Sequence, residues 1–190
     1  MSLADRTDRL VPGPGSTLDL LTERLQSRLL AVTDRPPLKR VVSLVSGESW
    51  LGHPTHPAIV MVPGGAWTIS ALYDLRGAGQ DDPELDRVAD AMLNIGLVAA
   101  VPAALTGIAQ FLRTDGLARR IAGIHWALNL TAVGLYSTSS VLRRRGNRTA
   151  GRRVAAAALA LVGPGAYLGS HLAYRLGVGS TPPAAGRGRA

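Results

Sequence analysis

The four histidines of this chain are the residues whose type and spacing could do chemistry. His56, His125 and His171 each lie in or at the end of a separate long apolar segment, and His53 precedes His56 by three residues. An imidazole is costly at membrane depth unless it faces a partner, a cofactor or trapped water, so such histidines indicate a functional site. Two neutral imidazoles that face each other across a helix bundle can hold a haem iron axially, and this arrangement needs no cysteine.

Four apolar segments are long enough to place these histidines in a membrane. Each is close to the roughly 20 residues that span a ~30 Å hydrocarbon core, and almost no charge interrupts them. They cover residues 57–75, 88–112, 121–142 and 154–174. We therefore predict an all-α fold, an integral membrane four-helix bundle, located as a multi-pass protein in the inner (plasma) membrane of the cell.

The order of four crossings brings the histidines to one side of the membrane. His56 lies at the entrance of the first helix, His125 a turn or two after the start of the third, and His171 about as far before the end of the fourth. We expect all of them in one leaflet, with His125 and His171 very roughly 8 Å below the helix ends at 1.5 Å per residue. This shared depth predicts an intramembrane site.

Polar residues accompany the histidines at this depth. Thr106 and Gln110 lie near the end of the second helix, which reaches the same leaflet. Asn129 follows His125 by one turn on the same helical face. We expect these three side chains to orient an imidazole if a cofactor is bound.

The first functional hypothesis is a redox accessory subunit for electron transfer. In it His125 and His171 ligate b-type haem, and His56 is the alternative ligand. A redox protein would then be the partner of the chain. The spacing of His53 and His56 does not by itself define another metal site, so the identity of any further metal is left unknown.

The second hypothesis is a structural or partner-binding membrane bundle without a cofactor. The histidines would then be packing and hydrogen-bond residues, each interhelical contact contributing about 0.6 to 2 kcal/mol. No Ser or carboxylate constellation accompanies the histidines in a recognisable motif, so catalytic residues are not assigned and an enzyme is disfavoured. A proton-conducting bundle has too little intramembrane acid, Asp90 being the only candidate. The sequence leaves the first two hypotheses open.

Charge and cysteine content exclude several classes of protein. The 190-residue chain has a net charge of +8 and no cysteine, which excludes disulfides, thiolate metal sites and iron–sulfur ligation. Arginines cluster between the apolar segments, for example at 143–145, and this juxtamembrane pattern attracts anionic lipid. We expect the lipid bilayer as a partner and no nucleic acid. Small residues on the helix faces permit a homo-oligomer.

A second polar group lies at the far end of the first helix. Tyr73, Asp74 and Arg76 are expected to be interfacial anchors, with Tyr136 near the same level. Asp74 is expected to pair with Arg76 or with an arginine of residues 143–153.

The chain is expected to have three parts. Residues 1–46 form an N-terminal segment whose first 15 residues have the composition of a disordered end, followed by an amphipathic helix at about 16–32 after a Ser16 or Thr17 cap. Residues 38–52 are expected to approach the membrane at its interface. Residues 47–179 form the four-helix domain, and 180–190 a disordered tail.

Several motifs together resemble a known family. The run Trp50-Leu51-Gly52-His53-Pro54-Thr55-His56-Pro57 is followed by Pro63-Gly64-Gly65-Ala66-Trp67, and the later segments are Thr106–Ala109, His125–Asn129 and Gly169–Val178. They resemble the domain of unknown function 2231 family of predicted four-helix bacterial membrane proteins over about residues 47–179. The family lacks an established activity. Some of its members are joined to or encoded beside Rieske iron–sulfur domains, so the resemblance implies a redox partner in the membrane.

Overall fold

The computed structural model describes residues 1–80 and 82–179, and the regular elements in this part of the chain are all helices. They divide between two compact units. Unit 1 consists of Met1–Thr55, Thr106–Ile124 and the described part of Tyr167–Ala190, and unit 2 of His56–Leu105 and His125–Ala166. The tail 180–190, expected from its composition to be disordered, lies outside the described residues.

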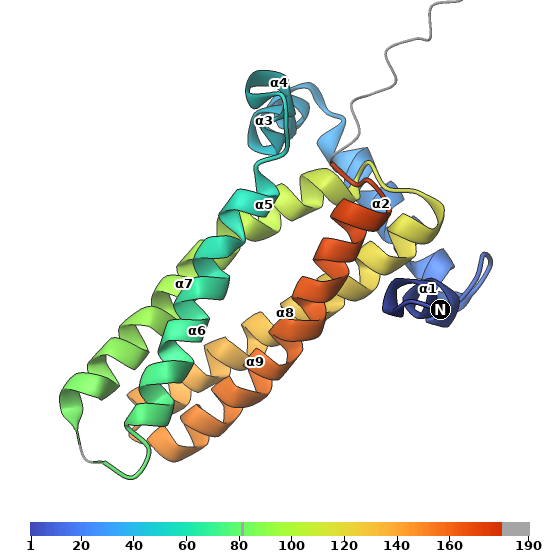
Figure 1. Cartoon of the computed structure of the whole chain (residues 1–190). Helices are drawn as coiled ribbons and strands as arrows, with labels where there is room; N and C mark the ends of the chain where they lie inside the picture. The colour runs from blue at the N-terminus through green and yellow to red at the C-terminus, as the bar shows by residue number, and fades with distance from the viewer. Residues whose placement is uncertain (81, 180–190) are drawn as a thin grey trace, which may run out of the picture. The chain divides into compact units, whose positions relative to one another are not determined.

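Unit 2 is built from the apolar helices (Figure 1). They are α5 (His56–Ile59), α6 (Met61–Arg76), α7 (Pro83–Phe111), α8 (Gly116–Arg144) and α9 (Arg148–Ser170), of which the last three also contribute to unit 1. Among the described residues, three segments are long and apolar enough to cross a membrane: His56–Arg76, Pro83–Phe111 and Arg148–Arg175. The fourth predicted crossing lies within the 29-residue α8, where polar residues such as His125 and Asn129 lower the hydropathy.

The exposed surface of α6 and α7 is apolar. Leu72 on α6 is 60% exposed and Val98 on α7 is 73% exposed, and other large apolar side chains on both helices are also exposed. Soluble monomers rarely present contiguous apolar surface of this kind. It suits the acyl chains of a bilayer, as the prediction of membrane helices requires.

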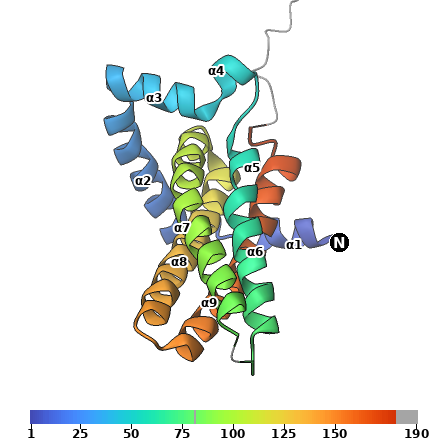
Figure 2. The ribbon, with the colours of Figure 1, turned by 90° about the vertical axis from the view of Figure 1, so that its left-hand side faces the viewer.

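The first crossing is interrupted close to its start. α5 ends at Ile59 and α6 begins at Met61, with Val60 between them. Pro57 and Pro63 each lie in the first turn of a helix, where the missing N–H has no intrahelical partner to lose. Figure 2 shows α5 leading directly into α6.

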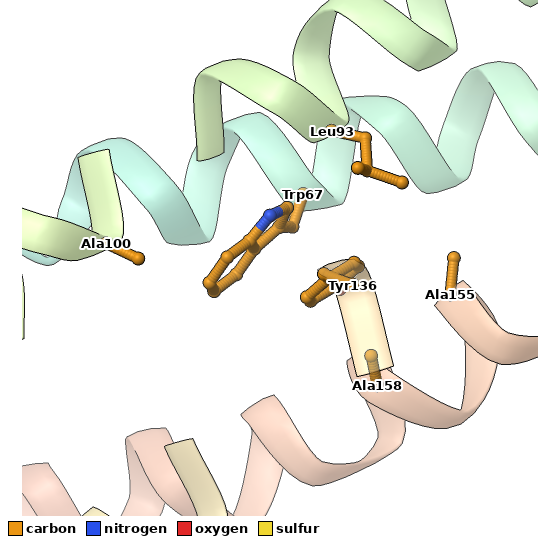
Figure 3. Close-up of a cluster of buried hydrophobic side chains, with 6 residues drawn as sticks. All are labelled: Trp67, Leu93, Ala100, Tyr136, Ala155 and Ala158. Carbon is orange, nitrogen blue, oxygen red and sulfur yellow. The ribbon is translucent and has the colours of Figure 1, made fainter. Parts of the chain in front are cut away.

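The core of unit 2 is an aromatic pair surrounded by small residues. Trp67 of α6 stacks on Tyr136 of α8 with ring centroids 4.3 Å apart. Gly96 of α7 permits this packing, because a β-carbon there would lie 2.3 Å from Trp67 Nε1. Tyr136 is 1% exposed and is therefore a core residue instead of the expected interfacial anchor. Figure 3 shows the side chains that complete this core: Leu93, Ala100, Ala155 and Ala158.

Aspartates and arginines from all four long helices of unit 2 form an ion-pair network. Arg143 of α8 makes a bidentate ion pair with Asp74 of α6. Its Nη1 also lies 3.0 Å from Asp90 Oδ1 of α7. The other carboxylate oxygen of Asp90 accepts from Arg148 Nη1 of α9 at 3.0 Å. Of the two partners expected for Asp74, the structure therefore selects the arginines of residues 143–153.

Asp86 and Arg152 close this network into a ring. Arg148 Nε lies 2.6 Å from Asp86 Oδ1, and Arg152 Nη2 lies 2.7 Å from the same oxygen. Arg152 Nε lies 3.4 Å from Asp74 Oδ1. Each aspartate of this Asp–Arg ring thus contacts two arginines, each arginine contacts two aspartates, and the six formal charges cancel.

Residues 1–15 contain a helix that the composition did not predict. α1 (Leu3–Leu10) begins with a capping box, in which Asp5 N donates to Ser2 Oγ at 3.2 Å and Ser2 N donates to Asp5 Oδ2 at 2.9 Å. The expectation of disorder is therefore wrong for this helix. The Pro- and Gly-rich stretch Pro12–Gly15 follows the helix. The helix was missed because a capping box depends on the order of residues, which composition alone does not show.

The predicted amphipathic helix is present as α2 (Thr17–Thr33), where half-buried Leu25 and Leu29 pack against an apolar cluster and the fully buried residues are polar. Ser16 is the cap, as expected, and its Oγ accepts from the backbone N of Asp19 at 3.2 Å. The buried residues of α2 are Asp19, Thr22 and Gln26, whereas Leu21 is 58% exposed. An exposed leucine beside the membrane segments is compatible with a helix at the lipid surface.

Polar residues of α2 satisfy groups at the ends of other helices in unit 1. Gln26 Nε2 donates to the carbonyl oxygens of Phe111 and Thr114 at 2.8 and 2.7 Å. Phe111 is the last residue of α7 and Thr114 lies in the turn after it, where carbonyls have no donor from a following helical turn. This need explains why a glutamine of α2 is buried.

Residues 38–52, expected to approach the membrane at its interface, lie mostly in two short helices. They are α3 (Pro36–Ser46) and α4 (Glu48–Leu51), separated by Gly47, whose φ of +80° suits glycine. Figure 2 shows α2 and α3 meeting at a corner, where Pro36 opens α3. Trp50 is 62% exposed, as expected for an indole at the level of lipid headgroups.

Asp74→Asn should destabilise unit 2. The substitution leaves the Arg143 guanidinium, whose side chain is 2% exposed, with one carboxylate instead of two. Removing one partner of a buried ion pair costs about 3–5 kcal/mol. The measurement is the free energy of unfolding of the purified protein in detergent. Arg144→Gln is the control, because Arg144 is exposed and its loss should change the free energy of unfolding by less than about 0.5 kcal/mol. Equal stability of the two variants would refute a stabilising role of the ring.

Asp19 should make the stability of unit 1 depend on pH. Hydrogen bonds from the Gly15 backbone and from Arg119 and Arg120 lower the pKa of the Asp19 carboxyl from 3.8 to about 2. A depressed folded-state pKa contributes stability that is complete above about pH 4 and is lost as the pH falls to about 2.

The test of this pH dependence is the unfolding temperature of Asp19→Asn relative to the parent between pH 6 and pH 2. We expect the variant to be less stable at pH 6, and the gap to close as the pH falls. Asp34→Asn, at an exposed ion pair with Lys39, is the control for removal of a carboxylate. A gap that stays constant down to pH 2 would contradict the assignment.

Candidate cofactor site around His56 and His125

The predicted site residues divide between the two units. Unit 2 contains His56, His125 and Asn129, and unit 1 contains His171, Thr106 and Gln110. The structure brings the three residues of unit 2 together at the start of their portion of α8. The other three, His171, Thr106 and Gln110, lie at separate places within unit 1.

His125 is held in one orientation by the backbone of α9. Its Nδ1 lies 2.8 Å from the carbonyl oxygen of Gly165. Because a carbonyl oxygen can only accept, Nδ1 carries the proton and Nε2 keeps the lone pair that binds a metal. Histidines that ligate metals usually donate their second ring N–H to an acceptor of this kind. The ring is therefore oriented as a ligand would be.

Asn129 contacts His125 as its position one turn later predicts. Its Nδ2 donates to the His125 carbonyl oxygen at 2.8 Å and lies 3.3 Å from both ring nitrogens. Gly165 provides the space, because a β-carbon there would lie 3.3 Å from Asn129 Nδ2. The amide therefore packs between the imidazole and α9.

His56 approaches His125 from the start of α5. The side chain is half-buried, is hydrogen-bonded to the backbone of Ala103 on α7, and interacts electrostatically with His125. Two imidazoles from different helices thus lie near each other in unit 2, and each is bonded to the backbone of another helix.

His171 has a different environment, in unit 1. It begins a π-helix, His171–Arg175, that follows α9, and its buried ring places Nε2 2.8 Å from Asp8 Oδ1 of α1. Arg175 Nη2 lies 2.8 Å from Asp5 Oδ1. One ring nitrogen of His171 is therefore engaged by a carboxylate, and these contacts attach α1 to the π-helix.

The remaining predicted residues lie elsewhere in unit 1. Thr106 is 2% exposed. Gln110 lines a cavity of about 620 Å³ together with the exposed His53 and the Arg113–Glu48 ion pair. Within the described part of the chain, the buried Nε2 of Gln110 has no hydrogen-bond partner.

The described histidines of unit 2 form a pair and not a larger ligand cluster. In residues 1–80 and 82–179, no cluster of three or more His, Asp or Glu side chains is arranged to hold a metal ion. A haem iron takes only one or two axial ligands from the protein.

Sequence reasoning did not find the Asp–Arg ring, although a signal was present. Asp86 and Asp90 are four residues apart, as are Arg148 and Arg152, so each pair shares a helical face. These arginines were expected to attract lipid. Their pairing with acidic residues on other helices was missed because it depends on the tertiary arrangement.

The fold and its exposed apolar helices define the class as a helical integral membrane protein. A family model described as a predicted membrane protein, domain of unknown function 2231, matches residues 52–182. The match covers more than half of the chain, and the chain belongs to this family. Neither the curated proteins nor the solved structures gave a match.

Weakening the contact between α1 and the π-helix should expose α1 to protease. Asp8→Asn removes the carboxylate that faces His171 Nε2 and lies 3.3 Å from Arg175 Nη2. Cleavage at Arg6 or Arg9 by trypsin requires local unfolding of α1, so we expect it to become several-fold faster. Mass spectrometry of timed digests of the purified protein measures the rate.

The matched control for this digest is Asp34→Asn, which removes an exposed carboxylate paired only with Lys39. Its cleavage rate within α1 should equal that of the parent. Equal rates for the Asp8 and Asp34 variants would show that the π-helix does not stabilise α1.

Proposed function

We propose that the His56 and His125 imidazoles of unit 2 hold the iron of a b-type haem, and that the chain is a redox accessory subunit in the membrane. The observation that carries the proposal is the pairing of two half-buried imidazoles from α5 and α8, each bonded to a backbone group. Bound haem would supply one-electron transfer, while the chain positions it and tunes its potential through ligands and hydrogen bonds.

Asn129 and Gly165 support this assignment. The contact between Asn129 Nδ2 and His125 Nε2 is 3.3 Å, which is long for a hydrogen bond. An iron ligated at Nε2 would therefore replace a weak interaction. The Gly165 carbonyl, at 2.8 Å from Nδ1, fixes the tautomer and increases the basicity of the ligating nitrogen.

His171 is less suited to ligate this haem than His56. Its Nε2 already lies 2.8 Å from Asp8, and separating a carboxylate from a buried partner carries a desolvation cost. We therefore assign the second axial position to His56, and give Thr106 and Gln110 no role at the iron.

The redox partner is a separate protein in this proposal. The chain has no cysteine, so it cannot build an iron–sulfur centre of its own. We place the complex in the inner (plasma) membrane of the cell, where the lipid-facing helices and juxtamembrane arginines fit.

An absorption spectrum tests the proposal. The protein is purified in detergent after expression with added haem, and spectra are recorded in air and after dithionite. We expect a Soret band that sharpens, with resolved α and β bands on reduction, as two imidazole ligands give. His56→Ala and His125→Ala should each abolish this low-spin spectrum.

His171→Ala is the matched control, because it removes a more deeply buried imidazole outside the proposed site. It should keep the spectrum. A spectrum lost in His171→Ala and kept in His56→Ala would reassign the axial ligand, and a flat spectrum of folded, monodisperse parent protein would refute haem binding.

A second candidate function is a structural or partner-binding bundle without cofactor. The observation that favours it is that His125 and His171 each have a protein partner, at Gly165 and Asp8. In this case His125→Leu assembles normally and no chromophore is found at any stage of purification. The same spectra therefore separate the two candidates.

A further inference from the structure

A groove of about 510 Å³ lies between α6 and α9 within unit 2. Trp67 and Tyr136 of the core line it, and most of its wall is apolar. From α6 it receives Ser70, Ala71, Asp74 and Leu75, from the turn after α6 Ala78, and from α9 Arg152, Arg153, Ala155, Ala156, Leu159 and Ala160. Its volume lies in the range of ligand sites in proteins.

The groove is charged at one end and apolar at the other. Asp74 lies toward the end of α6, and Arg152 and Arg153 lie near the start of α9, so the charges gather at one set of helix ends. The opposite end has Trp67 and Leu159. From Trp67 to Leu75 the lining on α6 covers about 12 Å at 1.5 Å per residue, which is most of one ~15 Å leaflet of the hydrocarbon core.

The charged end holds one arginine with no acidic partner. Asp74 and Arg152 belong to the Asp–Arg ring, whose formal charges cancel. Arg153 is exposed and forms no ion pair among the described residues. A guanidinium at the level of the headgroups attracts a phosphate and can donate to it bidentately.

We propose that this groove binds an anionic glycerophospholipid, with one acyl chain along α6 and α9 and its phosphate at Arg153. The length covers most of one leaflet, the wall matches a hydrocarbon chain, and the unpaired cation lies where the headgroup would be. A peptide would bring backbone N–H and C=O groups into this apolar wall, where few partners could satisfy them.

Native mass spectrometry of the full-length protein in mild detergent tests the site, with equal amounts of dioleoylphosphatidylglycerol and dioleoylphosphatidylcholine. We expect the protein to retain one phosphatidylglycerol molecule about fivefold more often than phosphatidylcholine. This ratio corresponds to the ~1 kcal/mol that one juxtamembrane arginine contributes to the binding of anionic lipid. Arg153→Gln should abolish the preference. Arg145→Gln removes the same charge from an exposed arginine outside the groove and should keep it.

A second pair of variants tests the apolar part of the groove. Ala156→Trp fills it and should eliminate retention of both lipids, whereas Ala157→Trp adds the same ring at an exposed neighbour that does not line it. Retention insensitive to Arg153 and Ala156 would overturn the proposal. A dimer that dissociates only in Ala156→Trp would also overturn it, because a second copy of the chain would then occupy the groove. A co-purifying quinone that is lost only in this variant would overturn it in the same way.

Discussion

The Asp–Arg ring is the interaction on which the rest of unit 2 depends. Six ionised groups at the ends of apolar helices would be expensive to bury singly, and the ring lowers this cost by giving each charge two opposite neighbours. It also connects α6, α7, α8 and α9, which fixes their order and their approach. Close contact of the helices then depends on small residues such as Gly96, where the Trp67 ring packs against α7.

The ring and the histidine pair occupy opposite ends of unit 2. Arg143 and His125 are 18 residues apart on α8, about 27 Å along a helix, which is close to the thickness of the hydrocarbon core. At the ring end the formal charges cancel within the protein. The histidine end has two imidazoles and an amide, and in the proposed function these would bind a ligand there without burying net charge. A redox cofactor at the histidine end and a lipid headgroup at the arginine end are compatible with this division.

Unit 1 combines a small apolar core, formed by Phe111, Ile121, Ala122 and Leu172, with buried polar side chains that bond to helix ends. Asp19 and Gln26 of α2 bond to arginines and helix-end carbonyls, while Asp5 and Asp8 of α1 bond to the π-helix. Where helices end, backbone groups and charges need partners more than apolar side chains do. Short amphipathic helices at the edge of a membrane segment can supply these partners.

The sequence by itself determined the helical class, the apolar segments, the Ser16 cap and the contact of Asn129 with His125, because these follow from hydropathy, capping chemistry and helical spacing within one segment. The tertiary structure decided what depends on pairing between distant segments. Asp74 could pair with Arg76 or with distant arginines until α6 and α8 were placed together. His125 interacts with His56 within unit 2, and His171 pairs with Asp8 within unit 1. Local patterns do not encode these choices, since each partner is more than 60 residues away along the chain.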